Sequence, residues 1–318
     1  MIKLDVRRRF DPQMAIALAE SQKLYAAGPP AAPDDVAAQR AAYSRERAFW
    51  NAIKPPLAAI EPLSVPGPGG AIACRLYRPS QARLLPALVY FHGGGWVLGD
   101  LDTHDRIMRL LAQKSGALVL GVDYRLAPEH KFPAAHDDAL AAFRHAARRG
   151  REWGIDVARL AVGGDSAGAN LALASCLSLG PAERAAVKLQ LLYYGAFGLS
   201  DSASMRAYGN ELDGLTRADM ARYRGQLTRS PADLEDPRLD NLSADLRGLP
   251  PAFIAAAGLD PLLDDSRALS ELMSEVGVAN TLTIYPGVLH GFMHYSRVLD
   301  VAMRALEESA AALKQALA

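Results

Sequence analysis

The stretch RLAVGGDSAGAN, residues 159–170, decides the fold. An apolar run ends in two glycines, and a helix-favouring segment begins directly after Ser166. Gly164 and Gly168 flank this serine in a G-x-S-x-G pattern, which needs small residues because a strand-to-helix turn this tight leaves no room for side chains. The sequence therefore predicts a nucleophilic serine on such a turn. The helix behind it is expected to direct its N-terminal N–H groups toward the reaction site.

Strands and helices alternate along the chain on both sides of this turn. Short apolar runs bounded by turn residues are typical of strands that are covered on both faces, and their alternation with helices predicts an α/β class with a mostly parallel central sheet. The predicted helices cover 107–116, 134–149 and the segment from Ala167 onward. The predicted strands are ALVYF (87–91), ALVLGVDY (117–124), RLAVGG (159–164), LQLLYYG (189–195), AFIAAAG (252–258) and NTLTIYPG (280–287).

A serine hydroxyl is a poor nucleophile until a base removes its proton, so a histidine is required. His290 is the candidate because it follows the predicted strand 280–287, in the loop VLHGFMHY, and the ends of parallel strands meet at one edge of a sheet. His294, in the same loop, is its nearest rival.

A carboxylate must hold the imidazole in the correct tautomer. Asp260 directly follows the predicted strand 252–258, whereas Asp264 and Asp265 lie about one helical turn further on. The order Ser166, Asp260, His290 is the order expected of a catalytic triad in an α/β-hydrolase.

The stretch FHGGGW, residues 91–96, follows an early predicted strand. Glycine lets backbone approach a ligand closely, so this loop is a candidate source of the N–H groups that stabilise an oxyanion. Gly94 and Gly95 are the predicted donors, together with Ala167 after the serine, although the sequence does not fix which amides point inward. His92 is expected to support the loop.

The first 55 residues differ from the rest because they contain helix signals and no strand signal. Asp11 with Pro12 begins one predicted helix, and Pro33 with the two aspartates that follow it begins another that extends toward Trp50. The Pro/Gly-rich stretch EPLSVPGPGG, residues 61–70, is interpreted as a link. We expect residues 1–55 to form cap helices and residues 56–318 to form the catalytic domain, with a cap insertion at about 199–249.

The composition restricts the classes of function. The 318 residues contain 35 Lys+Arg and 35 Asp+Glu, so no overall positive field favours nucleic acid. Two cysteines are too few for a disulfide framework, and no Cys/His spacing is typical of a zinc site. No segment is apolar for long enough to span a membrane. A cytoplasmic protein that binds neither nucleic acid nor membrane is expected.

Five motifs occur in a fixed order: HGGGW, VDYRLAPEHKFPAAHDD, GDSAG, GLDPL and LHGF. Together they resemble the hormone-sensitive-lipase-like family of bacterial carboxylesterases, over roughly residue 71 to the C-terminus. The resemblance implies an α/β-hydrolase fold with a helical cap, hydrolysis of short- to medium-chain esters, no cofactor, and a homodimer as one assembly. It also places Ser166, Asp260 and His290 on the triad positions, and Gly94, Gly95 and Ala167 on the oxyanion positions.

Three other interpretations compete with the esterase. An amidase or peptidase would use the same groups but would have to protonate an amine leaving group. A non-enzymatic small-molecule receptor could share the fold, although such a protein is expected to lose a triad member. A metal enzyme is disfavoured because the H-E-x-x-H pattern is absent, so no metal ligands are predicted.

Overall fold

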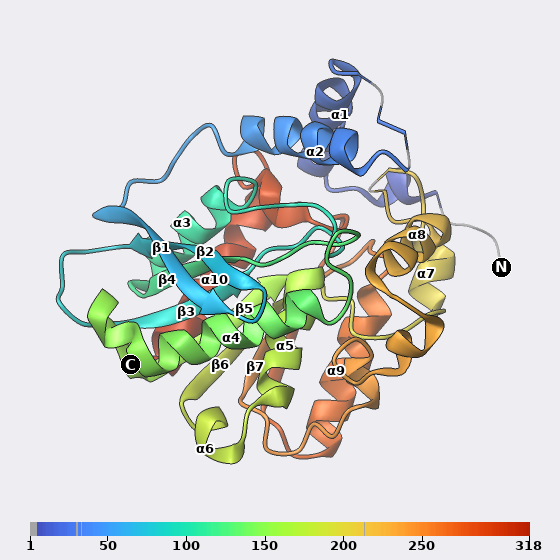
Figure 1. The fold of residues 1–318 in the computed structure, drawn as a ribbon. Helices are drawn as coiled ribbons and strands as arrows, with labels where there is room; N and C mark the ends of the chain where they lie inside the picture. The colour runs from blue at the N-terminus through green and yellow to red at the C-terminus, as the bar shows by residue number, and fades with distance from the viewer. Residues whose placement is uncertain (1–4, 30, 33, 213) are drawn as a thin grey trace.

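The computed structural model describes residues 5–29, 31–32, 34–212 and 214–318, and their centre is an eight-stranded sheet (Figure 1). The strand order is β1-β2-β4-β3-β5-β6-β7-β8. Strands β3 to β8 are parallel, and β1 and β2 are antiparallel to their neighbours, so the predicted mostly parallel sheet is confirmed. The strands are β1 (Ala59–Gly67), β2 (Gly70–Arg78), β3 (Leu85–Phe91), β4 (Leu118–Asp123), β5 (Ile155–Asp165), β6 (Val187–Tyr193), β7 (Ala252–Ala257) and β8 (Asn280–Tyr285).

Helices cover both faces of the sheet, which explains why the strands read as unbroken apolar runs. Successive side chains of a strand point to opposite faces. In β3, Val89 and Phe91 lie in the hydrophobic cluster that also includes residues of α4 (Ala134–Arg149), α5 (Ala167–Ser178) and α9 (Leu263–Glu275). Leu88 and Tyr90 lie in the cluster on the other side, which includes residues of α3 (Asp105–Ser115) and α10 (Asp300–Ala316).

The Pro/Gly-rich stretch 61–70 corrects the prediction of a link. Most of it lies in β1, which pairs with β2 as an antiparallel hairpin that closes between Gly67 and Gly70. Proline removes a ladder donor and is therefore confined to edge strands. Pro62 and Pro66 are tolerated because β1 is the outermost strand of the sheet.

The N-terminal helices begin where the sequence predicts. Asp11 caps α1 (Pro12–Ala26) by accepting from the N–H of Gln13, and Asp35 caps α2 (Val36–Trp50) by accepting from the N–H of Ala38. Pro33, the other predicted start signal, lies outside the described residues. The 199–249 segment contains α7 (Ala203–Tyr208) and α8 (Arg217–Leu227), drawn near α1 and α2 in Figure 1.

Short elements complete the chain: α6 (Pro181–Arg184), η1 (Val6–Arg9), η2 (Gly150–Trp153), η3 (Pro231–Glu235), η4 (Asn241–Ser243) and η5 (Phe292–Tyr295). Across the described residues, no helix combines the length and the apolar character that crossing a bilayer requires.

Candidate active site

Ser166 occupies a strained turn between β5 and α5. Its backbone angles, φ 53° and ψ −119°, lie in a region that residues with a side chain rarely adopt. The turn is tight because it packs on the end of β3: a Cβ added at Gly168 would lie 2.0 Å from the carbonyl oxygen of Phe91, and one at Gly164 would lie 2.4 Å from the same oxygen. The predicted need for glycine on both sides of Ser166 is therefore met in the structure.

His290 joins the serine to a carboxylate. Its Nε2 lies 2.9 Å from Ser166 Oγ, and its Nδ1 lies 2.8 Å from Asp260 Oδ2. Asp260 is fully buried, and its other oxygen accepts from the N–H of Leu262 at 2.8 Å, which fixes the carboxylate plane. The structure thus brings the three predicted residues into one hydrogen-bonded chain from the ends of β5, β7 and β8.

The rival residues have other partners. His294 is buried, packs edge-on against His104 with ring centroids 4.6 Å apart, and has its pKa lowered well below the usual value by burial. Asp264 accepts from the N–H of Ser204. Asp265 is buried and accepts from three successive backbone N–H groups, those of residues 197–199. These hydrogen bonds hold the start of the 199–249 segment, and burial raises the pKa of Asp265 to about 7.

The glycine loop after β3 lies over the serine. Gly94 has φ 122°, and a Cβ there would lie 2.1 Å from the carbonyl oxygen of Leu98, so only glycine fits. Gly94 and Gly95 both line the cavity that contains Ser166 and His290. Within the described part of the chain, the N–H groups of Gly94, Gly95 and Ala167 donate to no protein acceptor. All three are therefore available to donate hydrogen bonds to an oxyanion.

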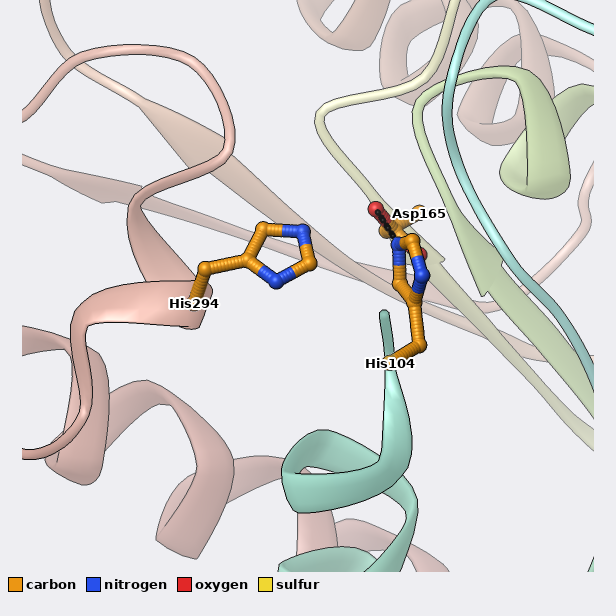
Figure 2. A group of neighbouring side chains, drawn as sticks. All are labelled: His104, Asp165 and His294. Carbon is orange, nitrogen blue, oxygen red and sulfur yellow. Dashed lines mark ion pairs between the residues drawn. The ribbon is translucent and has the colours of Figure 1, made fainter. Parts of the chain in front are cut away.

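Asp165, next to the serine, connects the serine turn to the glycine loop through hydrogen bonds. One carboxylate oxygen accepts from Tyr90 Oη at 2.8 Å and from the N–H of Gly93 at 3.0 Å. The other lies 3.4 Å from His104 Nε2, and Figure 2 shows this contact as a dashed line. Burial favours the neutral acid, but His104 and Tyr90 hold the pKa of Asp165 below its usual value. Asp165 is therefore an ionised link between the serine turn and the glycine loop.

His104, Asp165 and His294 are the one group of metal-ligating side chains that converge among the described residues, with one ligand atom of each within 4.8 Å of the others (Figure 2). Sequence reasoning did not identify His104, because a single histidine before a helix carries no distinguishing pattern. Its Nδ1 lies 2.9 Å from Thr103 Oγ1. We interpret these three side chains as a support for the serine turn, because His104 and Asp165 contact each other and the surrounding loops.

A cavity of about 420 Å³ lies above Ser166. Its floor is the part formed by the loops after β3, β5, β6, β7 and β8, and includes Gly94, Gly95, Asp165, Ser166 and His290. Its roof is the part formed by α1, α2 and residues 211–212 and 214–223, among them Leu18, Tyr43, Arg47 and Tyr223. The sequence predicted that the first two helices cap the site but did not indicate which of their side chains line this cavity.

His92 has the supporting position that the sequence predicts. Its ring stacks on Tyr124 with centroids 4.4 Å apart, and its Nδ1 lies 2.9 Å from the carbonyl oxygen of Gly93. Burial lowers the pKa of His92 to about 4, so the ring is neutral at physiological pH.

Comparison with known proteins places these features in a family. Residues 88–294 match the model of a protein family that has the alpha/beta hydrolase fold. An acetyl esterase of Salmonella choleraesuis is 43% identical over 282 residues, which cover 88% of this chain and 87% of that protein. A hyperthermophilic esterase from the archaeon Pyrobaculum calidifontis superimposes with a TM-score of 0.91 at 37% identity, over 98% of this chain and all of that one.

A thermophilic and thermostable carboxylesterase cloned from a metagenomic library superimposes with a TM-score of 0.87 at 36% identity, over 91% of this chain and 98% of that one. The resemblance inferred from the five motifs is confirmed. The chain belongs to the α/β-hydrolase family, in its hormone-sensitive-lipase-like branch of carboxylic ester hydrolases.

Proposed function

We propose that this protein is a serine carboxylesterase that hydrolyses small esters with short to medium acyl chains. The observation that carries the proposal is the hydrogen-bonded chain from Ser166 through His290 to the buried Asp260. The names of its relatives support ester substrates, and one of them is an acetyl esterase.

The first half of the reaction forms an acyl-enzyme. With Nδ1–H donated to Asp260, the lone pair of His290 Nε2 accepts the proton of Ser166 while Oγ attacks the ester carbonyl carbon. The carbonyl oxygen becomes an oxyanion, which the N–H groups of Gly94, Gly95 and Ala167 stabilise. His290 then gives its proton to the departing alcohol, and the serine remains acylated.

The second half returns the enzyme to its starting state. Water takes the place of the alcohol, and His290 removes a proton from it as it attacks the acyl carbonyl. The same three amides stabilise the second oxyanion. Collapse of that intermediate expels Ser166 Oγ, which regains its proton from His290, and the carboxylic acid leaves.

We propose that residues 1–55 and the insertion at about 199–249 form a cap that selects substrate. Met14 and Leu18 of α1, Tyr43 of α2 and Met220 of α8 line the same cavity as Ser166. A cavity of about 420 Å³ suits a small ester better than a long-chain triglyceride. The cytoplasmic location stays a prediction, as does a homodimer formed through an edge strand and the last helix, which a sedimentation mass of one chain would exclude.

The experiment is hydrolysis of p-nitrophenyl esters from C2 to C12, with a matched p-nitroanilide, by the wild type and Ser166→Ala. We expect a rate maximum at short chains, no measurable anilide hydrolysis, and loss of at least about 10⁴-fold in kcat for the variant. Ser175→Ala is the matched control, because Ser175 lies on α5 and its hydroxyl donates only to the helix carbonyl of Leu171. A wild type without turnover would favour a receptor, and rapid anilide cleavage would favour an amidase.

A further inference from the structure

A second, smaller cavity adjoins the catalytic one. It has a volume of about 240 Å³ and lies between α8, the segment that follows β6 and residues 234–240. Trp96, Ala196 and Met220 line both cavities, so these three residues form the partition between them. We call this second cavity the side compartment. The partition decides whether a substrate bound at Ser166 can extend into it.

The inner part of the side compartment is apolar. Leu227 and Leu239, which line it, are buried, whereas Ser200 and Leu234 are exposed and form its solvent side. Arg224 also lines the compartment, but its Nη2 donates to the carbonyl oxygen of Leu199 at 2.7 Å. A hydrocarbon chain gains free energy when it leaves water for an apolar surface. The compartment therefore suits an alkyl chain.

The three residues of the partition differ in how far they can move. Trp96 is buried, and its carbonyl oxygen accepts from the N–H of Ala127 at 2.9 Å, so the glycine loop holds it in place. Ala196 has only a methyl group as its side chain. Met220 has an unbranched side chain with three rotatable bonds, which adapts to the space around it. Met220 is therefore the residue that determines whether the two cavities are joined.

Met220 is held in the partition by its neighbours. It is 7% exposed and belongs to a small apolar cluster whose other buried members are Met205, Leu215 and Leu262. The turn of α8 that carries Met220 begins with a capping box, in which the side chains of Thr216 and Asp219 accept from each other's backbone N–H groups. The cap and the cluster together keep this side chain between the two cavities.

We propose that Met220 limits the chain length of the esters that this enzyme accepts, because its side chain closes the side compartment to the substrate. The inference rests on the proposed esterase function and names its substrate class, which is esters that fit within the catalytic cavity alone. The excluded alkyl chain can belong to the acyl part or to the alcohol part of the ester, since both present the same apolar surface.

Two series of esters distinguish these parts. The p-nitrophenyl esters from C2 to C12 lengthen the acyl part, and the acetates of straight-chain alcohols from C2 to C12 lengthen the alcohol part. Release of p-nitrophenol is followed by absorbance, and release of acetic acid by titration at constant pH. Both series are measured with the wild type and with Met220→Ala.

In at least one series, we expect the rate constant kcat/KM of the wild type to fall for the longest chains. In that series Met220→Ala should raise kcat/KM of the C8 ester about 10- to 100-fold, since several more methylenes become buried, and should change that of the C2 ester less than about threefold. No gain for long esters in either series would overturn the proposal. If Met220→Ala fails to fold, Met220→Val removes less volume and should give a smaller gain in the same direction.

Met205→Ala is the matched control. Met205 is buried in the same cluster as Met220 but is not among the residues that line the two cavities. Its truncation should lower Tm by a similar amount without a gain for long esters. Equal gains in the two variants would mean that loosening of the cluster, and not an opened partition, admits the longer chain, which would contradict the role of Met220.

Filling the compartment from its solvent side tests whether the longer chain enters it. Leu234 lines the compartment but not the catalytic cavity, and it is 37% exposed, so Leu234→Trp should fold. Added to Met220→Ala, this substitution should reverse the gain for the C8 ester and leave the C2 rate unchanged. A gain that persists would refute the proposal, as would a wild type that hydrolyses C12 and C2 esters equally well in both series. Failure to hydrolyse any ester would instead remove the proposed esterase function.

Discussion

The floor and the roof of the cavity are held together in different ways. In the floor, side chains at the ends of adjacent strands contact one another through buried hydrogen bonds, as Asp260 does with His290 and as Asp165 does with Gly93. In the roof, α1 and α2 pack on the sheet domain through apolar side chains such as Met14 and Trp50, and through hydrogen bonds between elements distant in sequence. One of these joins Asn51 to Thr103 and Arg106, over distances of 2.9 and 2.7 Å.

This difference separates two tasks. Parallel strands in one sheet hold Ser166, His290 and Asp260 at fixed distances, which the proposed proton transfer between Ser166 and His290 requires. Substitutions in helices that lie over the sheet can alter the cavity without moving those three residues. We therefore expect substitutions in the floor to reduce kcat and substitutions in the roof to change KM and substrate preference.

The largest effect should come from Asp260→Asn. Asparagine keeps the shape but favours the wrong imidazole tautomer, so we expect kcat to fall by about 10⁴-fold with little change in KM. Asp265→Asn is the matched comparison, because Asp265 is also buried yet accepts only from backbone N–H groups, which an amide oxygen can equally bind. Ester hydrolysis by both variants tests this, and an equal loss would contradict the roles assigned to the two carboxyls.

Asp265 also makes the stability of the fold depend on pH. Burial raises the pKa of Asp265 from 3.8 to about 7, so the folded state binds its proton more tightly than the unfolded state. The stability from this group is complete below pH 4 or so and is lost as the pH rises through about 7. Asp265→Asn should therefore flatten the fall in Tm between pH 5 and pH 8, and an unchanged fall would argue against a raised pKa.

Gly94→Ala tests whether the glycine loop is as rigid as the strand ends. The added methyl group would lie 2.1 Å from the carbonyl oxygen of Leu98, so the loop must shift and its N–H groups with it. We expect kcat to fall by about 10²- to 10³-fold, the range found for loss of an oxyanion donor. Gly116→Ala is the control, because Gly116 also has positive φ but has open space around its Cβ position.

The smallest effect should come from the roof, with Arg40→Ala. Arg40 of α2 donates to the carbonyl oxygens of Val97 and Ala127 and pairs with Glu129, which ties the roof to the glycine loop. We expect KM to rise a few-fold and Tm to fall by about 2–4 °C, with kcat nearly unchanged. Steady-state kinetics and thermal melts test this. A fall in kcat as large as the rise in KM would contradict the expectation that the roof affects only KM and substrate preference.

The sequence by itself determined the fold class and predicted which serine, aspartate and histidine come together. Glycines around Ser166 are required wherever a strand turns this sharply, and strand ends in a parallel sheet converge, so Asp260 and His290 follow from position along the chain. The same local reasoning failed for residues 61–70, because prolines that would break a central strand are tolerated in β1 at the sheet edge.

Only the tertiary structure decided what surrounds the reacting groups. Periodicity predicted that α1 and α2 each have a buried face, but it could not say that Leu18 and Arg47 face the cavity, since the contact joins segments more than a hundred residues from Ser166. His104 likewise acquires its role only through its distance to Asp165. Local sequence determines backbone geometry and strand order, whereas cavity walls are set by how distant elements pack.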